Sequence, residues 1–198
     1  MKPSQKDFKF DKRAASYDSG FEGKLSSKFY NALLSQVKLQ DGFSVLDVGC
    51  GTGYVLRKMA SSTSIHGYGI DVEDEMIAVA RKKCPDMTIQ RSPCENTPFS
   101  DCQFDVLTAC MAYHHFSDKA GFIKEASKIL KPGGCLYIAD PFFPYPIRKI
   151  INAILKLVRL TGKFFTAHEI ETDFSKEGFK MSSVYKSGIV QVLTLVKS

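Results

Sequence analysis

Apolar positions along this chain change repeatedly between a helical spacing and short continuous runs. Within residues 26–39, Phe29, Leu33 and Val37 lie four positions apart, which predicts a helix with one apolar face. Short, mainly apolar runs between turn residues predict buried strands instead. By these two patterns the predicted strands are 44–48, 66–70, 87–90, 104–109 and 135–139, and the predicted helices are 26–39, 53–60, 73–84 and 119–130.

Turn residues separate these elements at the places where the pattern changes. The helix at 73–84 ends before Pro85, because the residue before a proline is disfavoured in a helix. The sequence Lys-Pro-Gly-Gly at 131–134 predicts a helix stop followed by a turn. The chain therefore alternates strand and helix up to residue 139.

The carboxyl-terminal part predicts one more helix and a hairpin. Thr166 and Glu169 have the spacing of a capping box, which predicts a helix that runs to about residue 177 with Gly178 as its C-cap. Two strands, 180–186 and 189–196, then flank Ser187 and Gly188, a predicted hairpin turn.

Strands that alternate with helices are typical of a mostly parallel sheet with helices on both faces. The sequence therefore predicts an α/β fold with a Rossmann-like, doubly wound, seven-stranded sheet, in which the last hairpin adds an antiparallel strand. A chain of 198 residues can bury one sizeable core. We expect a single domain over 1–198, with a helical cap over 1–40 and an insertion over 141–165.

The insertion at 141–165 has the pattern of an amphipathic helix. Its apolar positions are Ile147, Ile150, Ile151, Ile154, Leu155 and Val158. The opposite face is predicted to carry Arg148, Lys149, Lys156, Arg159 and Lys163. Three interpretations stay open: a lid over a hydrophobic acceptor, a helix on an anionic membrane surface, or a helix packed on the core with a solvated basic face.

Composition restricts the class of protein. The hydrophobic fraction is 44% and no continuous apolar run is long enough to cross a bilayer, so we expect no transmembrane helix. The first residues lead into charge rather than an apolar segment, which argues against a signal peptide. The six cysteines form no C-x-x-C pair, which predicts free thiols in a cytoplasmic protein and no metal site.

The sequence VLDVGCGTG at 45–53 carries the strongest functional signal. An apolar run ends in Asp47 and Val48, and Gly49, Gly51 and Gly53 follow at alternate positions. Glycine allows positive φ angles and lets a ligand lie against the backbone. Turns of this kind at the carboxyl end of a parallel strand bind cofactors in doubly wound folds.

The glycine spacing distinguishes between cofactors. A dinucleotide-binding turn needs G-x-G-x-x-G, and its last glycine position is occupied here by Tyr54. The G-x-G-x-G spacing after Asp47 resembles instead motif I of the class I S-adenosylmethionine (SAM) methyltransferases. SAM has no phosphate but has an ammonium group, so an acid beside the turn suits it.

The resemblance extends over residues 8 to about 140. The segment 10–18 resembles the F-x-x-x-A-x-x-Y-D opening of the ubiquinone/menaquinone-type small-molecule C-methyltransferases. The segment 92–99 resembles the family's G-D-A-E-x-L-P-F, 104–116 resembles its strand ending in H-H, and 130–134 matches its L-K-P-G-G.

The resemblance implies SAM as cofactor, with S-adenosyl-L-homocysteine as product. Asp71 ends the strand at 66–70 and would accept hydrogen bonds from both ribose hydroxyls, and without that role it is a surface N-cap. Val72 and Met76 would lie along the adenine. Tyr17 would close over the methionine end or line the acceptor pocket, and otherwise it anchors the N-terminal segment. The full predicted cofactor set is Tyr17, Asp47, Gly49, Cys50, Gly51, Gly53, Asp71, Val72, Met76, Cys94, Glu95 and Cys110.

One position departs from the family pattern. Pro93 stands where the family usually has an acid that accepts from the adenine amine, and proline offers neither a side-chain acceptor nor a backbone donor. Adenine would then depend on the backbone of Cys94, the side chain of Glu95 and apolar packing. We expect SAM selectivity with a less tightly read adenine edge.

The methyl group of SAM is already activated, so the enzyme's main task is to hold a nucleophile in line with it. A general base helps only if the nucleophile must lose a proton. His114 and His115 are the candidates, since they follow the strand at 104–109 and imidazole titrates near neutrality. One of them is expected instead to pack or cap the following loop, and His66 and His168 are assigned structural roles.

The predicted function is a SAM-dependent methyltransferase acting on a small apolar or aromatic molecule. The net charge of +6 keeps a nucleic-acid (RNA) methyltransferase as an alternative, although the N/D-P-P-Y/F turn of base-methylating enzymes is absent after 104–109. A non-catalytic SAM-binding protein is a further alternative, and a nicotinamide dehydrogenase is disfavoured by Tyr54. The acceptor, the atom methylated and the oligomeric state stay open.

Overall fold

The computed structural model describes residues 21–158 and 162–198, and it contains one seven-stranded sheet. The strands are β1 (Ser44–Val48), β2 (His66–Asp71), β3 (Thr88–Arg91), β4 (Phe104–Cys110), β5 (Leu130–Pro141), β6 (Phe179–Ser187) and β7 (Val190–Lys197). Their order in the sheet is β3-β2-β1-β4-β5-β7-β6. The first five strands in that order pair in parallel, while β7 is antiparallel to both of its neighbours, β5 and β6.

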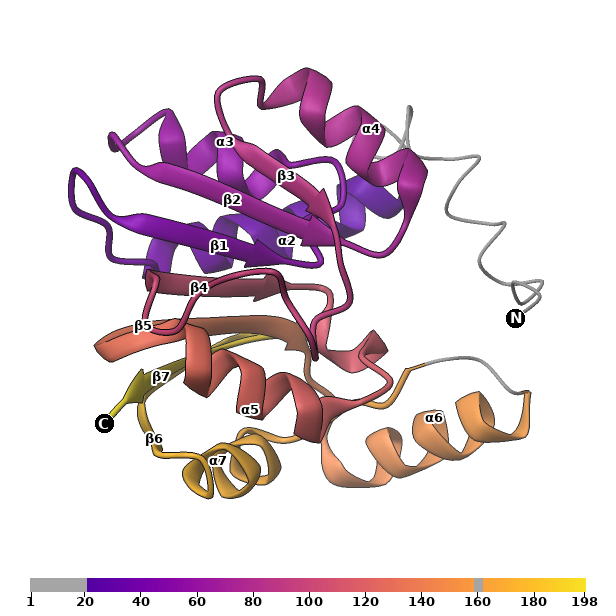
Figure 1. Cartoon of the computed structure of the whole chain (residues 1–198). Coiled ribbons are helices and arrows are strands. Elements are labelled where there is room, and N and C mark those ends of the chain that lie inside the picture. Colours follow the sequence, from indigo (N-terminus) through magenta and orange to yellow (C-terminus); the bar gives the residue numbers. More distant parts are fainter. Residues whose placement is uncertain (1–20, 159–161) are drawn as a thin grey trace.

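Helices cover both faces of the sheet (Figure 1). They are α2 (Phe21–Gln36), α3 (Tyr54–Ala60), α4 (Asp74–Lys83), α5 (Lys119–Ile129), α6 (Tyr145–Leu157) and α7 (Ala167–Ser175), with a short 3₁₀ turn at Tyr113–His115. Buried side chains of α2, α3 and α4 pack on one face, and those of α5 and α7 pack on the other. The predicted α/β architecture with an antiparallel carboxyl-terminal hairpin is therefore confirmed.

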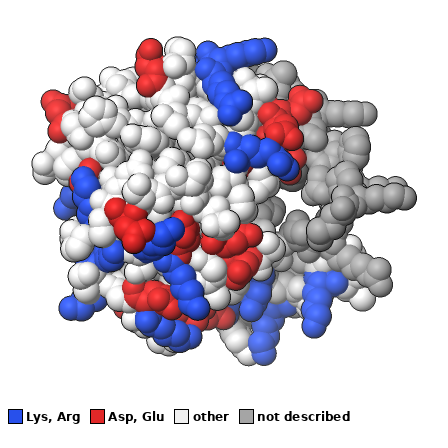
Figure 2. All heavy atoms as spheres, viewed as in Figure 1, with Lys and Arg blue, Asp and Glu red and all other residues white. Residues whose placement is uncertain are grey.

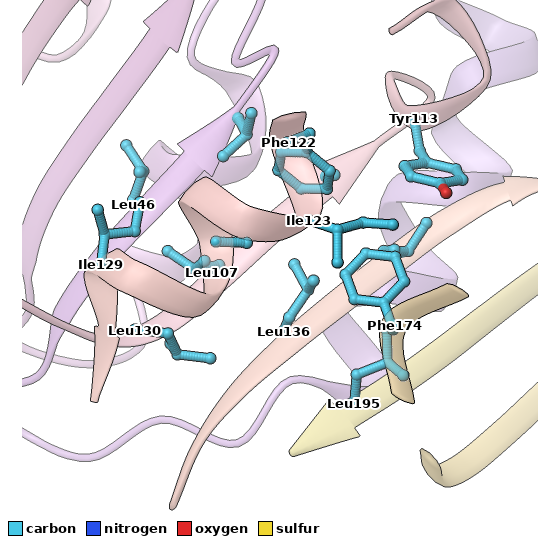
Figure 3. Packing of buried hydrophobic residues seen from close by; sticks show 14 of the residues in the cluster. Leu46, Leu107, Tyr113, Phe122, Ile123, Ile129, Leu130, Leu136, Phe174 and Leu195 are labelled. Carbon is cyan, nitrogen blue, oxygen red and sulfur yellow. The ribbon is translucent and has the colours of Figure 1, made fainter. Parts of the chain in front are cut away.

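The core on the α5 face is built from aliphatic side chains with a cluster of aromatic rings at one end. Figure 3 shows Phe122, Ile123 and Ile129 of α5 beside Leu107 and Leu136 of the sheet. The ring of Tyr113, which is almost fully buried, lies 6.0 Å from the rings of both Phe122 and Phe174. This packing fixes the chain immediately after β4.

The strand β5 is longer than predicted. The turn expected at 131–134 lies inside it as a bulge, because Leu130 pairs with Phe104 and Cys135 pairs with Val106. The four residues between Leu130 and Cys135 therefore stand opposite Asp105 alone. Lys131 closes this bulge by donating to Asp105 Oδ1 at 2.7 Å.

Most other predicted boundaries differ by a few residues. The predicted helix at 26–39 is α2, which begins earlier and ends at Gln36. The capping box is present, since the Thr166 side chain accepts from the Glu169 backbone and the Glu169 carboxylate accepts from Thr166. The hairpin turn is one residue later than predicted, at Gly188 and Ile189, because Ser187 pairs with Val190.

The helical cap over 1–40 and Tyr17 fall wholly or partly in residues 1–20, which lie outside the described part of the chain. Across the described ranges, no helix is long and apolar enough to cross a membrane. In the same ranges, no group of three or more His, Cys, Asp and Glu side chains could hold a metal ion.

Candidate functional site

A cavity of about 430 Å³ opens at the carboxyl edge of the parallel strands. This volume lies within the range typical of small-molecule sites. Residues at or just after the ends of β1, β2 and β4 form its floor, α2 forms one wall, and the loop after β3 forms another. The cavity thus occupies the position where doubly wound sheets bind ligands.

The glycine-rich turn forms the centre of the floor. The backbone N–H groups of Gly49 and Cys50 both donate to the carbonyl of Ile70, which fastens the turn to β2. Gly49 has a φ of +75°, and a Cβ there would lie 2.7 Å from the Cβ of Ala112. Glycine at 49 is therefore needed both for the backbone conformation and for the close approach of the loop after β4.

Gly51 is needed for a different reason. Its φ is +51°, yet a Cβ there would meet no described atom within 4 Å, so the backbone lies open. Its N–H group donates to Asp71 Oδ2 at 2.8 Å. Gly53 packs instead against α4, where a Cβ would lie 2.8 Å from the sulfur of Cys84, and it does not line the cavity.

Asp47 lies beneath the turn and is almost fully buried. Its Oδ1 atom accepts a hydrogen bond from the Thr108 hydroxyl of β4 at 2.6 Å. Burial raises the pKa of Asp47 to about 7, although the Thr108 bond opposes the shift, and the charge of Asp71 raises it further. A buried carboxyl group of this kind is stabilised in its charged form by a cation brought to it.

Asp71 joins the turn to the next loop. Its Oδ2 accepts from Gly51 and its Oδ1 accepts from the backbone of Glu73 at 3.0 Å. Burial raises the pKa of Asp71 despite these backbone bonds. A carboxylate has about four acceptor positions, so both oxygens retain capacity for ligand hydroxyl groups.

The loop after β3 supplies the wall with Pro93, Cys94 and Glu95. The Ser92 hydroxyl shapes this loop through contacts with the carbonyls of Pro93 and Asn96 at 3.1 and 3.2 Å. The Cys94 thiol donates to the Glu95 carboxylate at 3.4 Å, and burial raises the pKa of that thiol. Pro93 contributes no side-chain acceptor, as expected, while Glu95 is the carboxylate on this wall.

The two adjacent histidines occupy different environments. His114 is buried, its Nδ1 lies 2.9 Å from Asp140 Oδ1, and its backbone N–H donates to Asp140 Oδ2. His115 lines the cavity, and its ring lies 3.9 Å from the ring of His114. Burial, together with His114 and Lys119, lowers the pKa of His115 to about 4, so its ring is neutral at pH 7.

The charged side chains in the described lining of the cavity are all acidic. Its described lining contains the carboxyl groups of Asp47, Asp71, Glu73 and Glu95, and it contains no Lys or Arg. This lining contrasts with the net charge of +6 for the whole chain. A site with this lining favours a cationic ligand and disfavours a phosphate-bearing one.

The cavity brings together most residues predicted from the sequence. Those that line it are Asp47, Gly49, Cys50, Gly51, Asp71, Val72, Met76, Cys94, Glu95, Cys110 and His115. Sequence reasoning missed other residues that also line it, namely Leu25, Ser26, Tyr30, Val48, Thr52, Tyr54, Val55, Ile70, Glu73, Ser92, Met111, Ala112, Phe116 and Ser117.

Some of the missed residues could have been recognised from the sequence, and others could not. Tyr54 directly follows the glycine-rich motif and stacks on Tyr30, with ring centroids 5.0 Å apart, so its place beside the motif was a usable signal. The α2 side chains reach the cavity only through long-range packing. Met111 has a positive φ of 55°, a strained conformation that the sequence pattern does not reveal.

Comparison with known proteins gives a consistent result. A family model described as a methyltransferase domain matches residues 46–138. The demethylmenaquinone methyltransferase of Chlorobaculum tepidum is 36% identical over 135 residues, which are 68% of this chain and 53% of that protein. The ubiquinone/menaquinone biosynthesis C-methyltransferase UbiE of Geobacter sp. strain M21 is 32% identical over 173 residues, 80% of this chain and 73% of that protein. The chain thus spans about half the length of the Chlorobaculum relative and nearly three quarters of the Geobacter one.

The fold has a close counterpart among solved structures. A chain in the complex between the Haloferax volcanii Trm112 methyltransferase activator and a methyltransferase aligns with a TM-score of 0.82, covering 96% of this chain and 97% of that one. The sequence identity is 21%, so this likeness shows the fold alone.

Proposed function

Because the chain belongs to the class I SAM-dependent methyltransferase family, we propose that it transfers the sulfonium methyl group of SAM to a small apolar or aromatic acceptor. The observation that carries this proposal is the cavity at the glycine-rich turn, with four carboxyl groups and no Lys or Arg in its described lining. SAM carries a sulfonium and an ammonium group, and it has no phosphate. The same lining disfavours the pyrophosphate of a nicotinamide cofactor.

The residues present fit SAM in their chemistry. Asp71 would hold the ribose hydroxyls, because its two oxygens are aligned by backbone donors and retain acceptor capacity. Asp47 would balance the ammonium group, and Gly51 leaves the open backbone beside it. Val72 and Met76 would pack on the adenine, with Glu95 as the carboxylate near its edge. Bound SAM supplies an electrophilic methyl group, and S-adenosyl-L-homocysteine is then the product.

For catalysis we propose that His115 is the residue that contacts the acceptor. It lines the cavity and is neutral at pH 7, so a ring nitrogen can accept a hydrogen bond from the acceptor, while its pKa of about 4 makes it only a weak general base. His114 is turned into the protein by Asp140, and its ring stacks at 5.2 Å on Phe164. We assign His114 and Asp140 to positioning the loop that carries His115.

Substitutions of the two histidines test this division of roles. His115→Ala should lower the rate of methyl transfer by at most about a hundredfold, the lower end of the effect of losing a general base, because its lowered pKa makes it a weak one; affinity for SAM should be unchanged. His114→Ala should lower the thermal stability instead, because the buried carboxylate of Asp140 loses a partner. Equal losses of SAM affinity in both variants would contradict the assignment.

The acceptor class rests on the relatives. Two of them are named for demethylmenaquinone and for ubiquinone/menaquinone biosynthesis, so a demethylmenaquinone-type acceptor is the first to test. Purified protein is incubated with methyl-labelled SAM and demethylmenaquinone, and label is counted in the organic extract. Transfer that disappears in Asp71→Ala supports the proposal, whereas tight SAM binding without transfer to this or other apolar acceptors supports the non-catalytic alternative.

The relatives and the acidic cavity lend no support to a nucleic-acid methyltransferase. We propose a cytoplasmic protein, in keeping with six cysteines that are all free thiols. A peripheral contact with an anionic membrane surface is also compatible with this function, since an apolar acceptor dissolves in lipid.

A further inference from the structure

The helix α6 presents a row of apolar side chains to solvent, while Arg148 and Asn152 face the protein. Ile150 is 60% exposed, Ile154 53% and Leu157 82%, whereas the Arg148 side chain is only 12% exposed. No residue of α6 is buried. A surface helix of a soluble domain normally turns its apolar face to the core, so α6 is mounted with much of that face outward.

Specific polar contacts hold the helix in this orientation. Arg148 donates to both oxygens of Glu169 at 3.0 and 2.7 Å. Asn152 makes two hydrogen bonds with the backbone of Phe164, both of 3.0 Å. These residues lie four positions apart on one side of α6, so that side is fixed against the body of the domain.

The outward side combines an apolar row with basic neighbours. Ile147, Ile150, Ile154 and Leu157 follow a spacing of three or four and form one row, which we name the α6 row. Lys149 and Lys156 lie seven positions apart on one flank of it, and neither makes an ion pair with a described carboxylate. The residues from 144 to 165 include no Asp or Glu. In Figure 2, Lys and Arg side chains project at the lower right, where Figure 1 places α6.

We propose that the α6 row docks on an anionic lipid surface. Aliphatic side chains on one face with lysines beside them fit the boundary between acyl chains and headgroups, where the chains bury the apolar row and the headgroup phosphates meet the ammonium groups. A second copy of the chain fits this face less well. Pairing two α6 rows would bring the lysines of both copies together without a carboxylate from either helix.

The docked orientation would bring the cavity close to the lipid. The segment after α6 returns over the histidines, where the N–H of Lys163 donates to the carbonyl of His114 at 3.0 Å. His115, the neighbour of His114, lines the cavity. An acceptor dissolved in the bilayer could then reach the catalytic edge of the sheet without crossing bulk water. This consequence rests on the proposed function, whereas the docking itself does not.

Vesicle co-sedimentation of the full chain tests the docking. Vesicles of phosphatidylcholine alone are compared with vesicles in which phosphatidylglycerol replaces about a third of the lipid. The protein should sediment with the anionic vesicles and much less with the neutral ones. Ile150→Glu/Ile154→Glu should reduce the bound fraction by roughly tenfold or more, and Lys149→Glu/Lys156→Glu should do so on anionic vesicles.

A matched control separates local from overall charge. Lys82→Glu/Lys180→Glu makes the same charge change on exposed positions of α4 and β6, and it should leave vesicle binding nearly unchanged. Each variant is also tested for thermal unfolding and SAM affinity, both of which should match the parent protein. Failure of the proposed function would show as lost SAM binding with intact vesicle binding.

Three results would overturn the docking proposal. The first is no binding to either vesicle type. The second is equal binding by the α6 variants and the control. The third is a parent protein that binds no lipid, is dimeric by sedimentation velocity and becomes monomeric in Ile150→Glu/Ile154→Glu. The last result would assign the α6 row to self-association.

Discussion

The cavity and α6 lie at the same edge of the sheet but are built in opposite ways. The described lining of the cavity has four carboxyl groups and no Lys or Arg, and its floor is a turn fastened to β2 by two backbone hydrogen bonds. The described residues of α6 include three bases and no acid, and the helix is joined to the domain mainly through Arg148 and Asn152.

The net charge of the whole chain is a poor guide to the ligand of either region. A net charge of +6 suggests an anionic partner, and α6 carries part of that excess. The cavity has the reverse character and suits a cation. The two regions therefore accept different partners, and substitutions can test whether they are also independent in energy.

The largest expected effect concerns the rigidity of the cavity floor. Gly49→Ala places a methyl group at φ +75° and 2.7 Å from the Cβ of Ala112, which should cost about 2–5 kcal/mol of unfolding free energy. Gly133→Ala is the matched control, because its φ is +77° and no atom lies within 4 Å of the added carbon. Its cost should be only about 1–2 kcal/mol. Denaturant unfolding measures both, and equal losses would mean that the floor is not tightly packed.

The next effect concerns cofactor affinity. Asp71→Ala removes the proposed ribose contacts and the acceptor that orients Gly51, so affinity for SAM should fall by about a hundredfold. Asp74→Ala is the control at the start of α4, since that side chain is 79% exposed and pairs with Arg91 at the surface. Isothermal calorimetry decides the matter, and unchanged affinity in Asp71→Ala would remove the SAM assignment.

The same contrast explains which parts were predictable from the sequence. The strand β1, the glycine turn and Asp71 lie in short segments whose chemistry is local, and the sequence placed them correctly in the fold. The wall supplied by Tyr30 was missed, because α2 reaches the cavity only after the chain has folded back.

For the same reason, the sequence pattern separated the two faces of α6 but left open which face meets the protein. Arg148 was assigned to the face opposite the apolar positions, and it turns toward the protein because both carboxylate oxygens of Glu169, at the start of α7, accept from it. A helical pattern gives the spacing of residues around an axis. It does not give the rotation of the helix against its neighbours, which here depends on Glu169 and Phe164.

A smaller effect should appear in the pH dependence of the cavity. The pKa of Asp47 in the ligand-free protein is about 7, and its charged form would balance the ammonium group of SAM. SAM affinity should therefore rise with pH between about pH 6 and about pH 8, and below the pKa it should rise by at most about tenfold per pH unit. Asp47→Asn should bind SAM more weakly and with a flatter pH profile. The stability of the ligand-free protein changes with pH in the opposite direction, because the pKa of Asp47 in the folded state lies above the unfolded value of 3.8. The contribution of this carboxyl group to stability is thus fully present below that value and is lost as pH rises through about 7.

The smallest effect tests whether the two regions are coupled. Asn152→Ala removes two hydrogen bonds to the Phe164 backbone, each worth about 1 kcal/mol, so amide exchange at residue 164 should become faster. SAM affinity should stay within about twofold of the parent protein, because no residue of α6 or of 162–166 lines the cavity and the glycine turn is fastened to β2. Phe164 does stack on His114, so any coupling would pass through that ring to His115 and would appear in the rate of transfer. A fall in SAM affinity in this variant would mean that the cavity and α6 form one energetic unit.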